Sequence, residues 1–215
     1  MKKLFLVTML FAIAAVAGAQ EYKFPLDDVK ALEINMNYGQ LYVRSAVDDK
    51  YFSVTVYPQK SGSLEKKIIL NDGKLRADFD DVQIDKNTVI TVKAPLKAEL
   101  KIKSVQAEVS VSNMAGFLSI EASSGTVKAD NFKGKLEIVT AQAEVSARGI
   151  FDSLKIETAK GDVRIKIDEL PQEYKYEISG AGNVFVDPGR KIKKNRKLVF
   201  EKNAAFTGKF EIKQR

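Results

Sequence analysis

An 18-residue repeat constrains this chain more strongly than any other feature of its sequence. Between positions 98 and 167, five sets of positions carry similar side chains in every 18-residue unit, over four units and without an insertion. Such a repeat indicates stacked structural units and has to be identified before single elements are assigned. The five columns are Leu100, Leu118, Leu136, Leu154; Ile102, Ile120, Ile138, Ile156; Val109, Val127, Val145, Val163; Val111, Ala129, Ala147, Ile165; and the small residues Ala107, Gly125, Ala143, Gly161.

The spacing within each unit predicts two short strands. Leu100 and Ile102 alternate with polar residues, and Val109 and Val111 do the same half a unit later. Alternation with a period of two is typical of a strand with one buried face. Small residues and glycine separate the pairs, as in Ser123-Ser124-Gly125, and these residue types allow a tight turn.

The pattern continues on both sides with less regularity. We expect irregular rungs at residues 30–95 and 174–187 and a C-terminal strand pair at 198–213 that caps the stack. Further strands are predicted at Phe52–Tyr57, Ile68–Leu70, Leu75–Phe79 and Val89–Lys93. Neither a long amphipathic helix nor a domain linker rich in proline, glycine or serine is evident.

These observations predict an all-β fold, a parallel β-solenoid with 18-residue, two-strand rungs and a right-handed coil favoured. One unit cannot bury its own apolar face, whereas stacked units bury it together. An antiparallel sandwich is the alternative, since its strands also recur at a regular spacing of roughly 8–12 residues. A sandwich does not require the same side chain at the same position of every 18-residue unit, so the solenoid is favoured.

The composition excludes several classes of chemistry. The 215 residues contain no cysteine, no histidine and no tryptophan. There is consequently no disulfide, no thiolate nucleophile, no imidazole base and no His- or Cys-ligated metal. We expect no cofactor and no metal.

Residues 1–19 read as a secretory signal peptide. Two lysines precede an apolar run of about 13 residues and an Ala-Gly-Ala sequence, so cleavage is expected after Ala19. The run is shorter than the roughly 20 residues of a membrane-spanning helix, although an uncleaved anchor is the alternative. The mature chain, 20–215, is therefore expected in the periplasm, at the cell surface or outside the cell. Without cysteine it cannot be a lipoprotein.

The repeat resembles a family of bacterial cell-envelope adhesin-like proteins of unknown function. Their unit is Leu-x-Ile-x-Thr-x-Ser-Gly-Asp-Ile-x-Val, which Gly161-Asp162-Val163 matches fully and Gly125-Thr126-Val127 in part. Ala107-Glu108-Val109 and Ala143-Glu144-Val145 depart from it by replacing glycine with alanine. The resemblance covers roughly residues 32–186 and implies a β-solenoid at the envelope. It carries over no catalytic or binding residue.

A carbohydrate-active enzyme on a β-helix is a second hypothesis. Glu144 and Asp162 would be about 5 Å apart on neighbouring rungs, a separation that suits a retaining glycosidase. Such carboxyls must also line a cleft, and the regular units carry no inserted loop that could build one. A solvated face with mixed charges is the favoured interpretation, so catalytic residues are predicted to be absent.

The strongest charge signal is a run near the C-terminus. The formal net charge of +7 falls to +5 when the leader is removed, and six of the remaining basic residues lie in 190–197. This run could bind anionic lipid or glycan, whereas export argues against nucleic acid. An exposed loop without a partner is the favoured alternative. The candidate anion-binding residues are Arg190, Lys191, Lys193, Lys194, Arg196 and Lys197.

Together these features predict an exported, non-enzymatic β-solenoid of the bacterial envelope, a structural or interaction surface that is adhesin-like. Its partner, whether an envelope component, a glycan or another protein, is not specified by the sequence.

Overall fold

The computed structural model describes residues 19–25, 29–46, 51–57, 67–80, 86–189, 198–202 and 206–213. Strands dominate these residues, and no helix among them is long and apolar enough to cross a membrane. The thirteen strands are β1 Gln20–Pro25, β2 Ala31–Ser45, β3 Tyr51–Tyr57, β4 Ile68–Asn71, β5 Lys74–Asp78, β6 Val89–Ala94, β7 Glu99–Ser112, β8 Ala115–Thr158, β9 Asp162–Ile167, β10 Lys175–Gly180, β11 Asn183–Pro188, β12 Glu201–Lys202 and β13 Phe210–Ile212.

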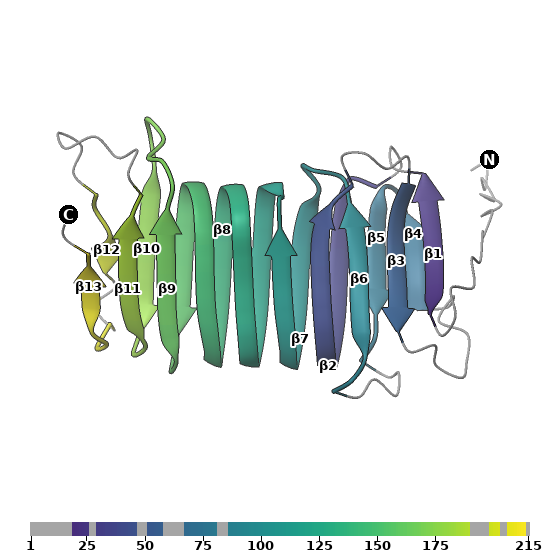
Figure 1. Cartoon of the computed structure of the whole chain (residues 1–215), viewed down its shortest axis with the longest axis horizontal. Coiled ribbons are helices and arrows are strands. Elements are labelled where there is room, and N and C mark those ends of the chain that lie inside the picture. The colour runs from purple at the N-terminus through teal and green to yellow at the C-terminus, as the bar shows by residue number, and fades with distance from the viewer. Residues whose placement is uncertain are drawn as a thin grey trace, which may run out of the picture.

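The strands form flattened coils stacked along one axis (Figure 1). Strands β2, β7 and β8 continue round the corners, so each contributes to two sides of the stack. We call the side that contains β5, β10 and β12 the A side, and the side that contains β6, β9, β11 and β13 the B side. The sheet is open, and β1 and β13 lie at its opposite ends.

The pairing between coils is parallel and follows the sequence columns. Leu100 pairs with Leu118 and Ile102 with Ile120 on the A side, while Val109 pairs with Val127 on the B side. The next coils continue this register, with Val145 opposite Val163. All column positions occupied by Leu, Ile, Val or Ala are buried between the two sides, and Leu118, Ile120 and Val127 have no exposed surface.

The corners stay within the hydrogen-bonded ladder. The sequence predicts turns at Ser123–Gly125 and Asn131–Gly134, yet both lie inside the 44-residue strand β8. The chain bends there at residues with positive φ, among them Asn131 (51°) and Gly125 (106°). Asn131 Nδ2 donates to Asn113 Oδ1 of the preceding coil at 2.7 Å, so stacked corners also bond to one another. A corner that repeats in register need not interrupt the sheet.

The N-terminal region departs from the simple order of rungs. Strand β2 pairs with β7 at an offset that places Leu32 opposite Leu100 and Leu41 opposite Val109. Strands β5 and β6 pair in parallel with its other edge. Beyond them, β4 pairs with β5, β3 pairs with β6 and the N-terminal β1 pairs with β3, all antiparallel. Residues 20–94 therefore extend the stack with parallel strands of β2, β5 and β6 and finish it with the antiparallel strands β1, β3 and β4.

The C-terminal strands pair at the opposite end. Strand β12 lies parallel to β10, and β13 lies parallel to β11. The strand expected at 198–200 is wrong, because these residues are irregular and β12 follows them at 201–202; the strand expected at 206–212 is shortened to 210–212. Half-buried aromatic rings accompany them, with Phe200 and Phe210 centroids 5.3 Å apart.

A charge placed in one of the buried columns should destabilise the whole stack. Replacing the buried Val145 with aspartate is expected to lower the free energy of unfolding by at least about 3 kcal/mol, because the carboxylate has no partner in the core. The neighbouring Ser146 is exposed, and Ser146→Asp should change stability by less than about 0.5 kcal/mol. Urea denaturation of both variants measures the difference, and equal stabilities would mean that this column does not point inward.

The corner glycine Gly125 should not tolerate a side chain. Its φ is 106°, and an added Cβ would lie 2.2 Å from the carbonyl oxygen of Ala107. Gly125→Ala is expected to cost about 2 kcal/mol from backbone strain, against less than about 1 kcal/mol for Thr126→Ala at the next, exposed position. Thermal and urea unfolding test this, and an unchanged Gly125→Ala variant would contradict the corner geometry.

Candidate functional site

The outward side chains of the B side line up in rows along the solenoid axis. Because paired strands are in register, residues one coil apart stand side by side at about 4.8 Å. Two adjacent rows matter here, separated in each strand by one inward-pointing residue. The first row contains Ser110, Lys128, Ser146, Arg164, Phe185 and Glu211; the second contains Ser112, Asp130, Arg148, Lys166, Asp187 and Lys213.

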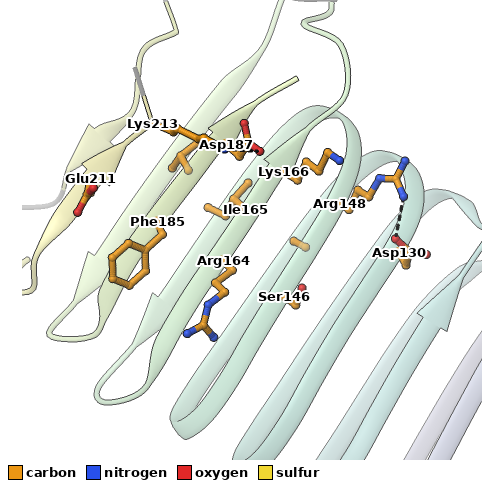
Figure 2. A pocket seen from close by; sticks show the side chains of 12 residues that line it. Asp130, Ser146, Arg148, Arg164, Ile165, Lys166, Phe185, Asp187, Glu211 and Lys213 are labelled. Atoms are coloured by element: carbon orange, nitrogen blue, oxygen red, sulfur yellow. Dashed lines mark ion pairs between the residues drawn. The ribbon is translucent and has the colours of Figure 1, made fainter. Parts of the chain in front are cut away.

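A surface hollow of about 570 Å³ lies between these rows over β8, β9, β11 and β13 (Figure 2). Ala147, Ile165 and Val186 form its floor, because their side chains turn into the core and leave backbone at the surface. Side chains of both rows form the walls: Ser146, Arg164, Phe185 and Glu211 on one side, and Asp130, Arg148, Lys166, Asp187 and Lys213 on the other. Such a volume is within the range of small-molecule sites.

The charges in the hollow are mixed, with four cations and three carboxylates. Arg148 lies 3.3 Å from Asp168 and 3.9 Å from Asp130, and Lys213 lies 3.9 Å from Asp187. Arg164 bonds Asp162 in its own strand at 3.2 Å. These are exposed pairs, and such pairs contribute little to stability.

The predicted carboxyl pair has a different environment from the one that an enzyme would need. The register that places Val145 opposite Val163 also makes Glu144 and Asp162 neighbours on the B side. Asp162, however, accepts hydrogen bonds from Arg164 at 3.2 Å and from Asn183 Nδ2 at 3.2 Å. Neither Glu144 nor Asp162 lines the hollow described above.

The structure does not describe the other candidate residues that the sequence indicated. The basic run Arg190, Lys191, Lys193, Lys194, Arg196 and Lys197 lies outside the described residues, as does the leader up to residue 18. Within the described part of the chain, no group of three or more Asp and Glu side chains could hold a metal ion.

The hollow was not predicted from the 18-residue repeat of the sequence. Arg148 and Lys166 are separated by one 18-residue period, so their pairing could have been predicted from the repeat. Phe185 pairs with Arg164 at an offset of 21, and with Glu211 at 26, because the chain leaves the period after Ile167. The alternating pair Val184-x-Val186 continues the column of Val163 and Ile165 in spite of this offset, so Phe185 could be assigned to the row of Arg164, whereas Glu211 could not.

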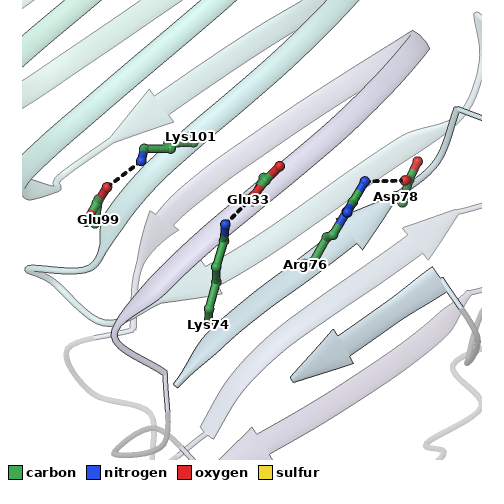
Figure 3. Close-up of polar contacts among 6 residues, drawn as sticks. All are labelled: Glu33, Lys74, Arg76, Asp78, Glu99 and Lys101. Carbon is green, nitrogen blue, oxygen red and sulfur yellow. Dashed lines mark hydrogen bonds and ion pairs between the residues drawn. The ribbon is translucent and has the colours of Figure 1, made fainter. Parts of the chain in front are cut away.

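The A side carries short ion pairs between outward side chains (Figure 3). Lys74 Nζ lies 2.5 Å from Glu33 Oε2, Lys101 lies 2.9 Å from Glu99, and Arg76 lies 3.1 Å from Asp78. The hydrogen bond from Lys74 holds the pKa of Glu33 below its ordinary value, against a smaller opposing effect of burial. The hydrogen bond to Glu99 raises the pKa of Lys101. These contacts tie outward side chains together, and the Glu99–Lys101 pair borders a surface hollow of about 530 Å³.

The Glu33–Lys74 pair predicts a pH dependence of stability. A lowered carboxyl pKa stabilises the fold above the ordinary value of 4.5, and this stabilisation is lost as the pH falls through the lowered value. Glu33→Gln should be less stable than wild type at pH 7 by under about 1 kcal/mol, and equally stable well below pH 4. Lys74→Gln should lose a similar amount at pH 7. Urea titrations at several pH values test this; a difference that persists in acid would contradict it.

Comparison with known proteins identifies the family. Two solved structures resemble this chain: a "putative adhesin" from Parabacteroides merdae, at 16% identity with a TM-score of 0.39, covering 93% of this chain and 98% of that one; and a "putative cell adhesion protein" from Clostridium sporogenes, at 12% identity with a TM-score of 0.37, covering 92% and 99%. No curated protein matches the chain. The family model described as Toastrack DUF4097 matches residues 22–209. The chain therefore belongs to the Toastrack DUF4097 family.

Proposed function

We propose that this protein is an exported, non-enzymatic β-solenoid of the bacterial envelope whose flat sides serve as adhesin-like interaction surfaces. The observation that carries the proposal is the row arrangement. Outward side chains of β7, β8, β9 and β11 stand in register over an uninterrupted stretch of coils, so they form one continuous surface rather than an enclosed pocket. A ligand can contact many strands at once on such a surface.

The proposed unit is a solenoid with 18-residue coils and a right-handed sense, formed by residues 20–215 as one mature domain. The pairing of Leu100 with Leu118 and of Val145 with Val163 supports the coil length. The handedness rests on the general preference of connections between parallel strands for right-handed crossovers.

The proposed location of the protein is the periplasm or the cell surface. Residues 1–19 have the charged start, the short apolar run and the small residues of a cleavable leader. The absence of cysteine leaves no residue for lipid attachment after the leader. This address argues against nucleic acid as a partner.

The surroundings of Glu144 and Asp162 support a non-enzymatic role. Glycoside hydrolysis needs two carboxyl groups that flank the scissile bond of a bound sugar. Here Asp162 is bonded by a guanidinium and an amide, and Glu144 is exposed on a flat strand. Neither residue lines the hollow between the two rows.

An alternative proposal is that the run 190–197 binds anionic lipid or glycan. Six basic residues within eight, without an acid, favour it, because clustered charge attracts polyanions over distances near the Debye length. It would add a second contact to the same interaction protein rather than a different class of function.

The proposal is tested by location and by binding of the intact protein. The full chain, tagged at its C-terminus, should fractionate with the periplasm or the outer surface, whereas a chain that begins at residue 20 after an initiating methionine should stay in the cytoplasm. Purified 20–215 should bind intact cells or isolated envelopes saturably. Cytoplasmic retention of the full chain would contradict the address, and absence of saturable binding would contradict the interaction role.

The enzymatic alternative has its own test. Glu144→Gln and Asp162→Asn should leave envelope binding unchanged within twofold, and incubation of the wild type with envelope polysaccharides should release no new reducing ends. Release of reducing ends by the wild type that both variants abolish would establish the alternative.

A further inference from the structure

We propose that the hollow over β8, β9, β11 and β13 is a binding subsite for an acidic oligosaccharide laid along the solenoid axis. Arg164 and Lys166 would bind its carboxylates, and Phe185 would support a sugar ring. The inference rests on the proposed interaction function and names its ligand chemistry. The site is distinct from the run 190–197 and uses only described residues.

The arrangement of cations in the hollow favours an anionic ligand. Arg148 and Lys166 stand directly opposite each other in paired strands, and like charges in this position destabilise a sheet. On its other edge Lys166 faces Asp187, which lies 3.9 Å from Lys213. None of the ion pairs among the described residues includes Lys166. Glu211, which also lines the hollow, instead pairs with Lys209 at 3.1 Å. An anion between Arg164 and Lys166 would relieve the repulsion and supply Lys166 with a partner.

Phe185 supplies an apolar element in an otherwise polar row. It stands between Arg164 and Glu211 in register, and its ring is half-buried (Figure 2). A partly covered ring still exposes apolar surface to water, and packing a flat, weakly polar face on it removes that surface from water, which is favourable. The carbon face of a pyranose has this character, whereas a free phosphate or sulfate offers nothing to the ring.

The carboxylates of the hollow favour a glycan over a membrane surface. An anionic bilayer would set negative charge against Asp130, Asp187 and Glu211 along the whole row, whereas a sugar chain can place its separated carboxylates beside Arg164 and Lys166. For an acidic sugar chain the same groups are useful, because carboxylates accept hydrogen bonds from hydroxyls. A row of cations, carboxylates and one aromatic ring therefore matches a chain that carries carboxylates, hydroxyls and apolar ring faces.

The shape of the hollow sets the orientation of the ligand. Its walls are two parallel rows that cross five successive coils, two of them in β8, so the long direction follows the axis of the stack. Neighbouring strands repeat at about 4.8 Å. A linear oligosaccharide lying in this direction would meet one set of outward side chains on every strand.

The test uses purified 20–215 and two probes, tetragalacturonate and its fully methyl-esterified, neutral form, in calorimetric titrations. The acidic probe should bind at least tenfold more tightly than the neutral one, with an affinity that falls as salt is raised. Arg164→Ala combined with Lys166→Glu should weaken acidic binding at least tenfold. Phe185→Ser should weaken binding of both probes. Lys155→Glu, on the A side, is the matched control and should leave binding unchanged within twofold.

Three results would overturn the proposal. These are equal affinity for the two probes, unchanged affinity in the Arg164/Lys166 and Phe185 variants although their unfolding curves match wild type, and loss of binding only when Arg190, Lys191, Lys193 and Lys194 are changed to serine. Vesicles of phosphatidylglycerol should bind no more weakly to the Arg164/Lys166 variant than to wild type; a parallel loss would assign the hollow to lipid. If the wild type binds envelopes but not the acidic probe, only the subsite is refuted. If the wild type does not bind envelopes at all, the proposed function itself is refuted.

Discussion

The parallel ladder between successive coils is the interaction on which the rest of the structure depends. It holds each residue beside its equivalent one coil away, as Leu100 beside Leu118 and Val109 beside Val127. A shift of one residue would turn every side chain to the other face and expose the core. The same register produces the buried columns and the outward rows. Core and surface are therefore two consequences of one periodicity.

The ladder also creates a difficulty, because a stacked sheet has two edges with unpaired backbone groups. The N-terminal end is completed by antiparallel strands, with the rings of Phe24 and Phe52 packed at a centroid distance of 5.8 Å. At the other end the rungs become short, and Tyr176 Oη donates to the carbonyl of Phe151 at 2.9 Å. Rings of Phe200 and Phe210 follow it. Aromatic packing replaces the small aliphatic columns where no further rung continues them.

The repeating part of the fold could be predicted from the sequence. The columns at 98–167 predicted which side chains are buried, and strands were expected at 52–57, 68–70, 75–79 and 89–93, close to where β3, β4, β5 and β6 lie. The antiparallel order of the N-terminal strands was not predicted, because periodicity identifies strands but not the partner on each edge. The unbroken corners were missed for a related reason: turn residues such as Asn131 mark a bend, while the ladder that spans it depends on the neighbouring coil.

Some residues of the candidate site could likewise be predicted from the repeat, and others could not. Arg148, Arg164 and Lys166 stand in regular units, so their neighbourhood was implicit in the 18-residue spacing. Glu211 and Lys213 reach the hollow only after the period is interrupted. The sequence drew attention instead to the basic run 190–197, because a cluster in the linear chain is visible there and a cluster across strands is not.

Distances between spin labels on successive coils test most directly the claim that the coils stack in register. Because the chain has no native cysteine, each label can be attached to an introduced cysteine. Cysteine pairs would be introduced at Ser110 with Lys128, with Ser146 and with Arg164. The in-register stack predicts separations that rise by about 4.8 Å per coil, from strong dipolar broadening in the first pair to weak coupling in the third. Separations that do not increase steadily along the series would contradict the stacked coils and the outward rows that depend on them.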